Sequence, residues 1–265
     1  MSHSHPAHSL DIERDGAIAG IVLTGPGKGN ALGPATWTEL PAAFDELEAD
    51  PGVRAVVISG RGEHFSTGLD IPAMVEAYDL AHDRGAASRR ELLALIERMQ
   101  AAITRVQTSP LPVIAALAGW CIGSGVELAC ACDLRYAQNG ARFSLREVRF
   151  AIVADLGGLA RLPGIVGEGR ARELALTGND IDAAQAERIG LVNAVVPDVH
   201  AHAAQIARGI AEHPPATVAG IKRVMNFQVG RPIADGLAYV AAWNAAFLQS
   251  DDLAQTFAAF ARRPH

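Results

Sequence analysis

Residues 112–163 read PVIAALAGWCIGSGVELACACDLRYAQNGARFSLREVRFAIVADLGGLARLP, and this stretch decides how the chain is organised. It begins with a run that has the length and apolar content of a buried strand, and a glycine-rich corner and a helix follow. Glu127, Glu147 and Asp155 lie among largely apolar neighbours, where ionised side chains need a partner, a metal or a shifted pKa. The stretch therefore predicts a functional site. A fourth acid, Asp133, is expected to end the preceding helix or to pair with the arginine two residues on.

A second glycine-containing loop stands earlier in the chain, at residues 60–71, directly after the valine- and isoleucine-rich run 53–59. Residues 118–125 repeat this arrangement, because in both places a strand leads into a loop whose backbone amides precede a helix. A helix N-terminus offers free N–H groups and the positive end of the helix dipole. Either corner alone is equally well explained by glycines that allow close helix packing. Together they predict two N–H donors that converge on one oxygen atom.

The rest of the chain reads as α/β structure followed by helices. Residues 10–24 predict two short strands joined by an Asp-Gly turn, and a last short strand is expected at 191–196. The sequence GPGKGNALG at 25–33 resembles a phosphate-binding loop, but its lysine is not followed by the Ser or Thr that binds magnesium in nucleotide-binding loops. A plain loop is therefore favoured, in which Lys28 can still meet an anionic ligand.

Composition narrows the class of protein. A chain of 265 residues with 49% hydrophobic residues can bury a substantial core. Its net charge is −6, and its basic residues are scattered among acids, which argues against nucleic acid as a partner. The apolar runs are too short and too often interrupted by glycine to span a bilayer, and the start MSHSHPAHS lacks the apolar core of a signal peptide. These features predict a soluble cytoplasmic protein without membrane association.

The cysteines and histidines indicate no metal site. Cys121, Cys130 and Cys132 are an odd number in one apolar segment, and this predicts buried free thiols. Several histidines lie in the polar residues 1–9, which predict a disordered, solvated tail.

Three segments together carry a resemblance to a known family. FSTGLD at 65–70, GWCIGSGVELACACDLRYA at 119–137 and REVRFAIVADLGGLARLPGIVG at 146–167 resemble the crotonase superfamily, the enoyl-CoA hydratase and isomerase group. Within that superfamily, EVRFAIVADLGGLARLP in the third segment and YVAAWNAAFLQSDDL at 239–253 are most similar to the Δ3,5-Δ2,4-dienoyl-CoA isomerases. The likeness runs over most of the chain, from Leu10 to Phe260.

The resemblance implies an α/β fold in which ββα units wind into a spiral over residues 10–197, followed by a C-terminal helical region, 198–265, that supports homotrimers or hexamers. It implies an acyl-CoA thioester as substrate in lipid β-oxidation and no further cofactor. The backbone amides of Leu69 and Ser124 match the two oxyanion donors of the family. The substrate is expected to lie near four further residues: Lys28, Ala31, Gly68 and Gly123.

The three acids then separate two reactions. Hydratases of the superfamily use two glutamates, matched here by Glu127 and Glu147, to add water to a 2-enoyl-CoA. At the position of Asp155 hydratases usually carry glycine, whereas dienoyl isomerases carry aspartate. The resemblance therefore favours isomerisation of 3,5-dienoyl-CoA to 2,4-dienoyl-CoA, in which Glu147 and Asp155 transfer protons. Glu127 stands where that branch has aspartate.

Other interpretations of the acids remain open at this stage. Glu127 could cap a helix or form an ion pair, Glu147 could pair with Arg146 or Arg149, and Asp155 could cap the helix that follows it. If the three share a dry pocket, they are expected to titrate as a coupled set, with at least one proton held to higher pH. A protein that binds acyl-CoA or RNA without catalysis is the alternative from another class.

Overall fold

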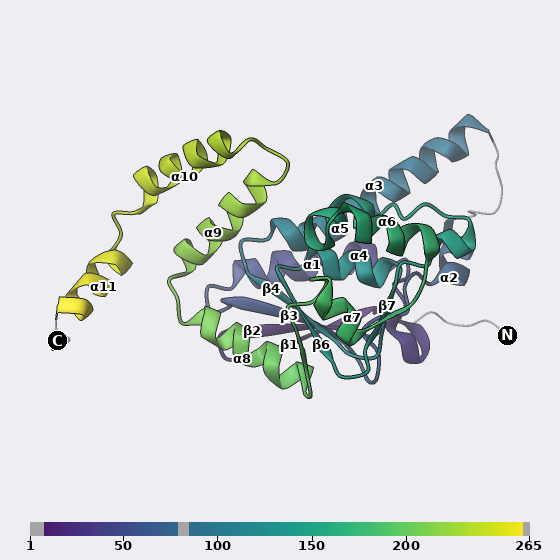
Figure 1. Ribbon diagram of the computed structural model, residues 1–265, viewed down its shortest axis with the longest axis horizontal. Coiled ribbons are helices and arrows are strands. Elements are labelled where there is room, and N and C mark those ends of the chain that lie inside the picture. Colours follow the sequence, from purple (N-terminus) through teal and green to yellow (C-terminus); the bar gives the residue numbers. More distant parts are fainter. Residues whose placement is uncertain (1–7, 79–84, 262–265) are drawn as a thin grey trace.

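The computed structural model describes residues 8–78 and 85–261, and its centre is a six-stranded sheet (Figure 1). The strand order is β1-β2-β3-β4-β6-β9, in which β1 and β2 are antiparallel and all other neighbours are parallel. The strands are β1 (Leu10–Asp15), β2 (Ile18–Leu23), β3 (Ala55–Gly60), β4 (Val113–Leu117), β6 (Leu134–Gln138) and β9 (Ala194–Val196). Each parallel neighbour requires a crossover, and the intervening segments supply it.

The structure contains a second, smaller sheet. It contains β5 (Trp120–Ile122), β7 (Arg142–Ser144) and β8 (Ile181–Asp182). Two isolated parallel bridges pair earlier parts of the chain in the same manner: Ser66 with Cys121, and Leu32 with Leu69. Successive turns of the chain thus add one strand to the large sheet and one short strand or bridge to the small one. The spiral of strand–strand–helix units predicted from the sequence is confirmed.

Helices cover both faces of the large sheet. The helices are α1 (Thr36–Ala49), α2 (Ile71–Tyr78), α3 (Ala86–Thr108), α4 (Ser124–Ala131), α5 (Gly158–Val166), α6 (Glu168–Thr177), α7 (Ala183–Arg188), α8 (Val199–Ala211), α9 (Pro215–Gln228), α10 (Ile233–Phe247) and α11 (Asp251–Ala261), with short helical turns η1 (Pro26–Asn30) and η2 (Glu147–Phe150). On β4, Val113 and Ala115 pack in the core with α1, α3 and α4, whereas Ile114 and Ala116 face α8. Burial on both faces explains why this strand is a continuous apolar run.

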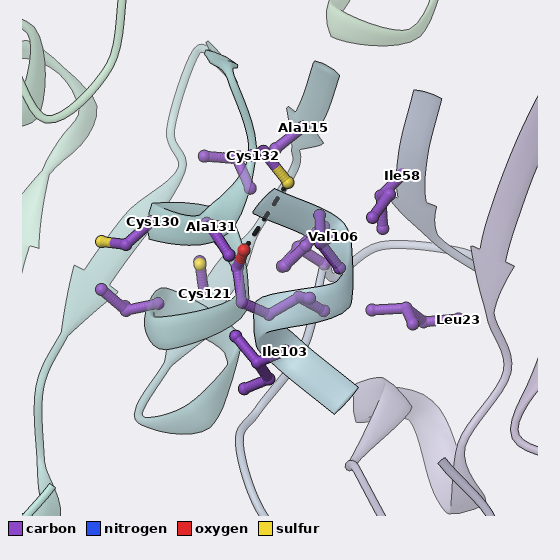
Figure 2. Packing of buried hydrophobic residues seen from close by; sticks show 14 of the residues in the cluster. Leu23, Ile58, Ile103, Val106, Ala115, Cys121, Cys130, Ala131 and Cys132 are labelled. Carbon is purple, nitrogen blue, oxygen red and sulfur yellow. Dashed lines mark hydrogen bonds between the residues drawn. The ribbon is translucent and has the colours of Figure 1, made fainter. Parts of the chain in front are cut away.

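The three cysteines lie inside the larger core, around α4 (Figure 2). All three are free and buried, as predicted. Burial raises the pKa of the Cys130 thiol to about 11 and that of Cys132 to about 12. The Cys132 Sγ donates to the carbonyl O of Leu128, one turn earlier in α4. These thiols therefore act as small apolar side chains at neutral pH.

The helices α9, α10 and α11 extend away from the sheet, whereas α8 lies against it (Figure 1). The buried ammonium group of Lys222, on α9, anchors this extension. Its Nζ lies 2.7 Å from Asp133 Oδ2 and donates to the carbonyl O atoms of Val106 and Leu111. The expected pairing of Asp133 with Arg135 is therefore wrong, because the partner comes from a distant helix and the guanidinium of Arg135 donates instead to backbone carbonyls. Asp133 does follow the end of α4, whose C-cap residue is Cys132.

The structure describes only the end of the predicted tail, because residues 1–7 lie outside its described part. Ser9, the last residue of the polar segment expected to be disordered, is ordered and buried beside β1, so the predicted tail is shorter than residues 1–9. Its N–H and hydroxyl both donate to Glu39 Oε2 at 2.7 Å, and its carbonyl accepts from Thr24 N. A charge-assisted contact to α1 thus orders the chain before the first strand begins.

Candidate active site

A cavity of about 350 Å³ opens where the two glycine corners meet the acid-bearing segment. The residues predicted from the sequence to form the site line it together: Ala31, Gly68, Leu69, Gly123, Ser124, Glu127, Glu147 and Asp155. Lys28 belongs to the turn η1, and its expected contact with an anion stays a prediction. Ile71, Pro72, Phe150 and Ile152 give the cavity an apolar wall, which suits an acyl chain better than a polar ligand.

The first corner presents the backbone N–H of Leu69. Leu32 forms a parallel bridge with Leu69, in which Leu32 N donates to Gly68 O at 2.8 Å and Asp70 N donates to Leu32 O at 3.0 Å. In such a bridge the residue between the two bonded groups points its own N–H away from the partner strand. Within the described ranges no acceptor receives the Leu69 N–H. Gly68 makes the turn with φ of +96°, a conformation that glycine adopts readily.

The second corner presents the N–H of Ser124, the first residue of α4. Amides in the first turn of a helix have no intrahelical acceptor, and the described residues offer this one no other partner. Gly123, just before it, has φ of +52°, and its own N–H donates to Ser144 O at 2.8 Å. A Cβ added to Gly123 would lie 3.0 Å from Glu147 Oε1. This second glycine therefore gives the turn its shape and leaves room for an acid beside the free amide.

Glu147 is the first residue of the turn η2 and forms no ion pair with a described residue. Its arginine neighbours point elsewhere: Arg146 forms two hydrogen bonds with Asp180 and stacks on the Trp120 ring at 4.9 Å, and Arg149 lies 3.8 Å from the same aspartate. The interpretation of Glu147 as an ion-pairing acid is therefore wrong. Its Oε2 is buried without a hydrogen-bond partner among the described residues. Burial, and secondarily the charge of Asp155, raises the pKa of this carboxyl group.

Asp155 lies between η2 and α5, half-buried at the cavity. Burial raises its pKa above the ordinary value for aspartate. It does not cap α5, since the N-cap residue of that helix is Gly157. The helix-capping interpretation is thus wrong for this acid, and its carboxyl group is available to a ligand.

Glu127, on α4, is held differently from the other two acids. It is only 1% exposed, and its Oε1 accepts from Leu156 N at 3.0 Å and from Gly158 N at 2.9 Å. Gly158 is the first residue of α5, so Glu127 does cap a helix, from across the fold. Burial raises its pKa to about 7, and the charges of Glu147 and Asp155 add to the rise. All three acids therefore hold a proton to higher pH than isolated carboxyl groups, as expected for a shared dry pocket.

Two polar residues around the acids were not found from the sequence. Gln100, on α3, donates from Nε2 to the carbonyl O of Asp155 at 2.6 Å. Arg161, on α5, donates to Gln107 and Thr104 and reaches toward Leu156 O. Gln100 lies outside the quoted motifs, and Arg161 lies within one but was given no role, because a polar residue on an amphipathic helix is expected to face solvent. Among the described residues, no group of three or more His, Cys, Asp or Glu could hold a metal ion.

Comparison with known proteins places this geometry in a family. The family model described as enoyl-CoA hydratase/isomerase matches residues 13–265. The chain belongs to this family. A crystal structure of an enoyl-CoA hydratase from Bacillus anthracis superposes with a TM-score of 0.87 at 28% identity, covering 96% of each chain. The fold and the general type of enzyme, an enoyl-CoA hydratase/isomerase acting on acyl-CoA thioesters, are therefore established for this chain.

The curated relatives include proteins named for the isomerase branch. A peroxisomal Δ3,5-Δ2,4-dienoyl-CoA isomerase of Arabidopsis thaliana is 40% identical over 251 residues, which cover 92% of this chain and 90% of the relative. A mitochondrial one of Homo sapiens is 36% identical over 243 residues, covering 89% and 74%. These names overturn the cytoplasmic location expected from the sequence. Composition separates aqueous from membrane proteins but not one aqueous compartment from another. No helix in residues 8–78 and 85–261 is long and apolar enough to cross a membrane.

Proposed function

We propose that this enzyme isomerises 3,5-dienoyl-CoA to 2,4-dienoyl-CoA. The observation that carries the proposal is the surroundings of two acids: Glu147 and Asp155 line one cavity, form no ion pair in the described part of the chain, and have raised pKa values. Two acids whose pKa values are raised by burial suit a reaction that takes a proton at one carbon and returns one at another.

The free amides of Leu69 and Ser124 are proposed to hold the thioester oxygen. When the C–H bond at C2 breaks, its electron pair spreads through the diene and onto this oxygen, where two N–H donors stabilise the negative charge. Removing one such donor typically costs about a hundredfold to a thousandfold in rate. The Ser124 amide also stands at the N-terminus of α4, where the helix dipole favours the developing charge.

A new C–H bond at C6 then completes the isomerisation and leaves double bonds at C2 and C4. One acid accepts the C2 proton and the other supplies the C6 proton, so one must be ionised and the other protonated when substrate binds. The raised pKa values of Glu147 and Asp155 support such a mixed state. The proton distribution is restored through solvent after each turnover, and no oxidant or reductant is needed.

Hydration of a 2-enoyl-CoA is the second candidate, because Glu127 and Glu147 both line the cavity. Glu127 is the weaker support for this reaction. Its Oε1 already accepts two backbone hydrogen bonds, which leaves Oε2 alone to position a water molecule. The isomerase function needs no proton transfer by Glu127.

The test offers purified protein 3,5-dienoyl-CoA and 2-enoyl-CoA separately. Formation of the conjugated 2,4-dienoyl thioester, followed by its absorbance, is the expected result. Hydration alone would replace the isomerase by the hydratase. Tight acyl-CoA binding in calorimetry, without turnover of either thioester, would make the protein a non-catalytic binder.

We further propose that the C-terminal helices bind copies of the same chain, as homotrimers or pairs of trimers. A groove of about 510 Å³ runs between α9, α10 and α11, and its Trp243 and Phe247 rings lie 4.7 Å apart. Large apolar side chains are more than half exposed on these helices: Ile221, Met225, Ile233, Leu237, Phe247 and Phe257. So much apolar surface is unusual for a monomer. Light scattering on the eluted protein should give three or six times 27.8 kDa, and a monomer would refute the proposal.

A further inference from the structure

Asp155 is held through its backbone by a helix that lies outside the cavity. Residues 151–157 join η2 to α5 without regular structure. Gln100, half-buried on α3, donates its hydrogen bond to the Asp155 carbonyl O at 2.6 Å, within this connection. None of the described residues of α3 lines the cavity. Gln100 therefore reaches the acid through the main chain and does not touch the space that a substrate would occupy.

The same peptide unit is held from its other side. The carbonyl of Asp155 and the N–H of Leu156 belong to one planar, trans peptide group and point in opposite directions. Gln100 donates to the carbonyl, and Glu127 Oε1 accepts from the N–H at 3.0 Å. Glu127 also holds Gly158 N, one residue beyond Gly157, whose φ of +102° suits glycine. Two side chains from different helices, α3 and α4, thus grip opposite edges of one peptide plane.

We propose that Gln100 is a positioning residue for proton transfer by Asp155. By fixing the peptide plane between residues 155 and 156 against Glu127, it fixes the backbone torsion from which the Asp155 carboxyl group projects. The acid then stands at one end of the dienoyl chain, while Glu147 serves the other. This inference rests on the isomerase function proposed above, and it assigns separate supports to the two acids.

The expected loss follows from geometry. Without the donor, one edge of the peptide plane is free and the Asp155 carboxyl group can move by a fraction of an ångström or more. A misplacement of about 1 Å can cost about a hundredfold in rate. We therefore expect Gln100→Met, which keeps the length of the side chain and removes the donor, to lower kcat about tenfold to a hundredfold. KM should stay unchanged, since Gln100 does not line the cavity.

The deciding readout is the position of proton exchange. In D₂O, wild-type enzyme should exchange deuterium into C2 of 3,5-dienoyl-CoA and into C6 of 2,4-dienoyl-CoA, both followed by NMR. Asp155→Asn identifies the carbon that Asp155 serves by abolishing exchange there. Gln100→Met should slow exchange at that same carbon and leave the other carbon near the wild-type rate. Equal slowing at both carbons, or no slowing at either, would overturn the inference.

A matched control and a measurement without substrate complete the test. Gln205→Met removes an exposed glutamine from α8, a helix that does not line the cavity, and it should retain exchange at both carbons. Hydrogen–deuterium exchange of the free protein should become faster in the peptide covering 151–158 in Gln100→Met but not in Gln205→Met. Unchanged protection of that peptide would refute the positioning role even if the wild-type enzyme proved to be a hydratase. Wild-type protein that fails to isomerise would refute the proposed reaction alone.

Discussion

Replacing Gly123 by alanine tests whether the close approach between the second glycine corner and Glu147 matters for catalysis. The added Cβ would lie 3.0 Å from Glu147 Oε1, closer than ordinary van der Waals contact. The carboxyl group or the corner must move by a few tenths of an ångström, and either movement disturbs a proposed catalytic group. The Ser124 amide directly follows the changed residue. Because loss of one oxyanion donor costs about a hundredfold or more, we expect kcat to fall about a hundredfold.

Backbone strain must be separated from this effect, and Gly140 provides the control. Gly123 has φ of +52° and Gly140 has φ of +84°, so alanine at either position is strained by a backbone conformation that residues with a Cβ rarely adopt. A Cβ at Gly140, however, meets nothing within 4 Å. Both variants should therefore lose stability in denaturant unfolding, while Gly140→Ala keeps its turnover of 3,5-dienoyl-CoA. If the two variants lost activity equally, the contact with Glu147 would have no catalytic importance.

Three further predictions concern the acids and the anchor of the C-terminal helices. Asp155→Asn should cut isomerisation about a hundredfold to ten-thousandfold, and near-normal turnover in the folded variant would remove Asp155 from the mechanism. The pKa of Glu127 is raised from 4.5 to about 7, so its contribution to stability is present below pH 4.5 and is lost as pH rises through 7. The free energy of unfolding of wild-type protein should therefore fall relative to that of Glu127→Gln over this pH window, by up to about 3 kcal/mol. A difference that does not change with pH would contradict the raised pKa. Lys222→Met leaves Asp133 partly buried without its cation and should lower the free energy of unfolding by about 3–5 kcal/mol. Arg172→Met removes an exposed ion pair and should lower it by less than about 1 kcal/mol. Similar losses in the two variants would show that Lys222 does not anchor the C-terminal helices.

The large sheet was predictable because its strands obey local rules. Val113–Leu117 is apolar throughout because both of its faces are covered. The first glycine corner follows β3 and the second follows β4. The small sheet was not predictable in the same way. Its strands β5 and β8 have three and two residues, too few for a periodic pattern, and their pairing depends on where the spiral brings them. Short strands of this kind are set by tertiary packing.

Contacts between distant segments also limited how much of the site could be predicted from the sequence. The sequence indicated which acids gather, but it could not give their partners, because neighbours in sequence compete with residues from other helices. Arg146 pairs with Asp180 instead of Glu147, and Asp133 pairs with Lys222. Gln100 carried no signal, since its importance comes from a backbone carbonyl on another segment. Every residue has a backbone carbonyl, so the residue type does not reveal which carbonyl accepts a side-chain hydrogen bond.

The three acids differ in what their surroundings leave free, and this difference bears on the role of Glu127. A carboxyl group with one oxygen bound to two amides of the α5 N-terminus is favoured in its ionised form by those bonds and disfavoured by burial. Its protonation would weaken the grip on the peptide plane beside Asp155. Glu127 thus holds the turn that carries Asp155 through Oε1, so the placement of one acid depends on the charge of another.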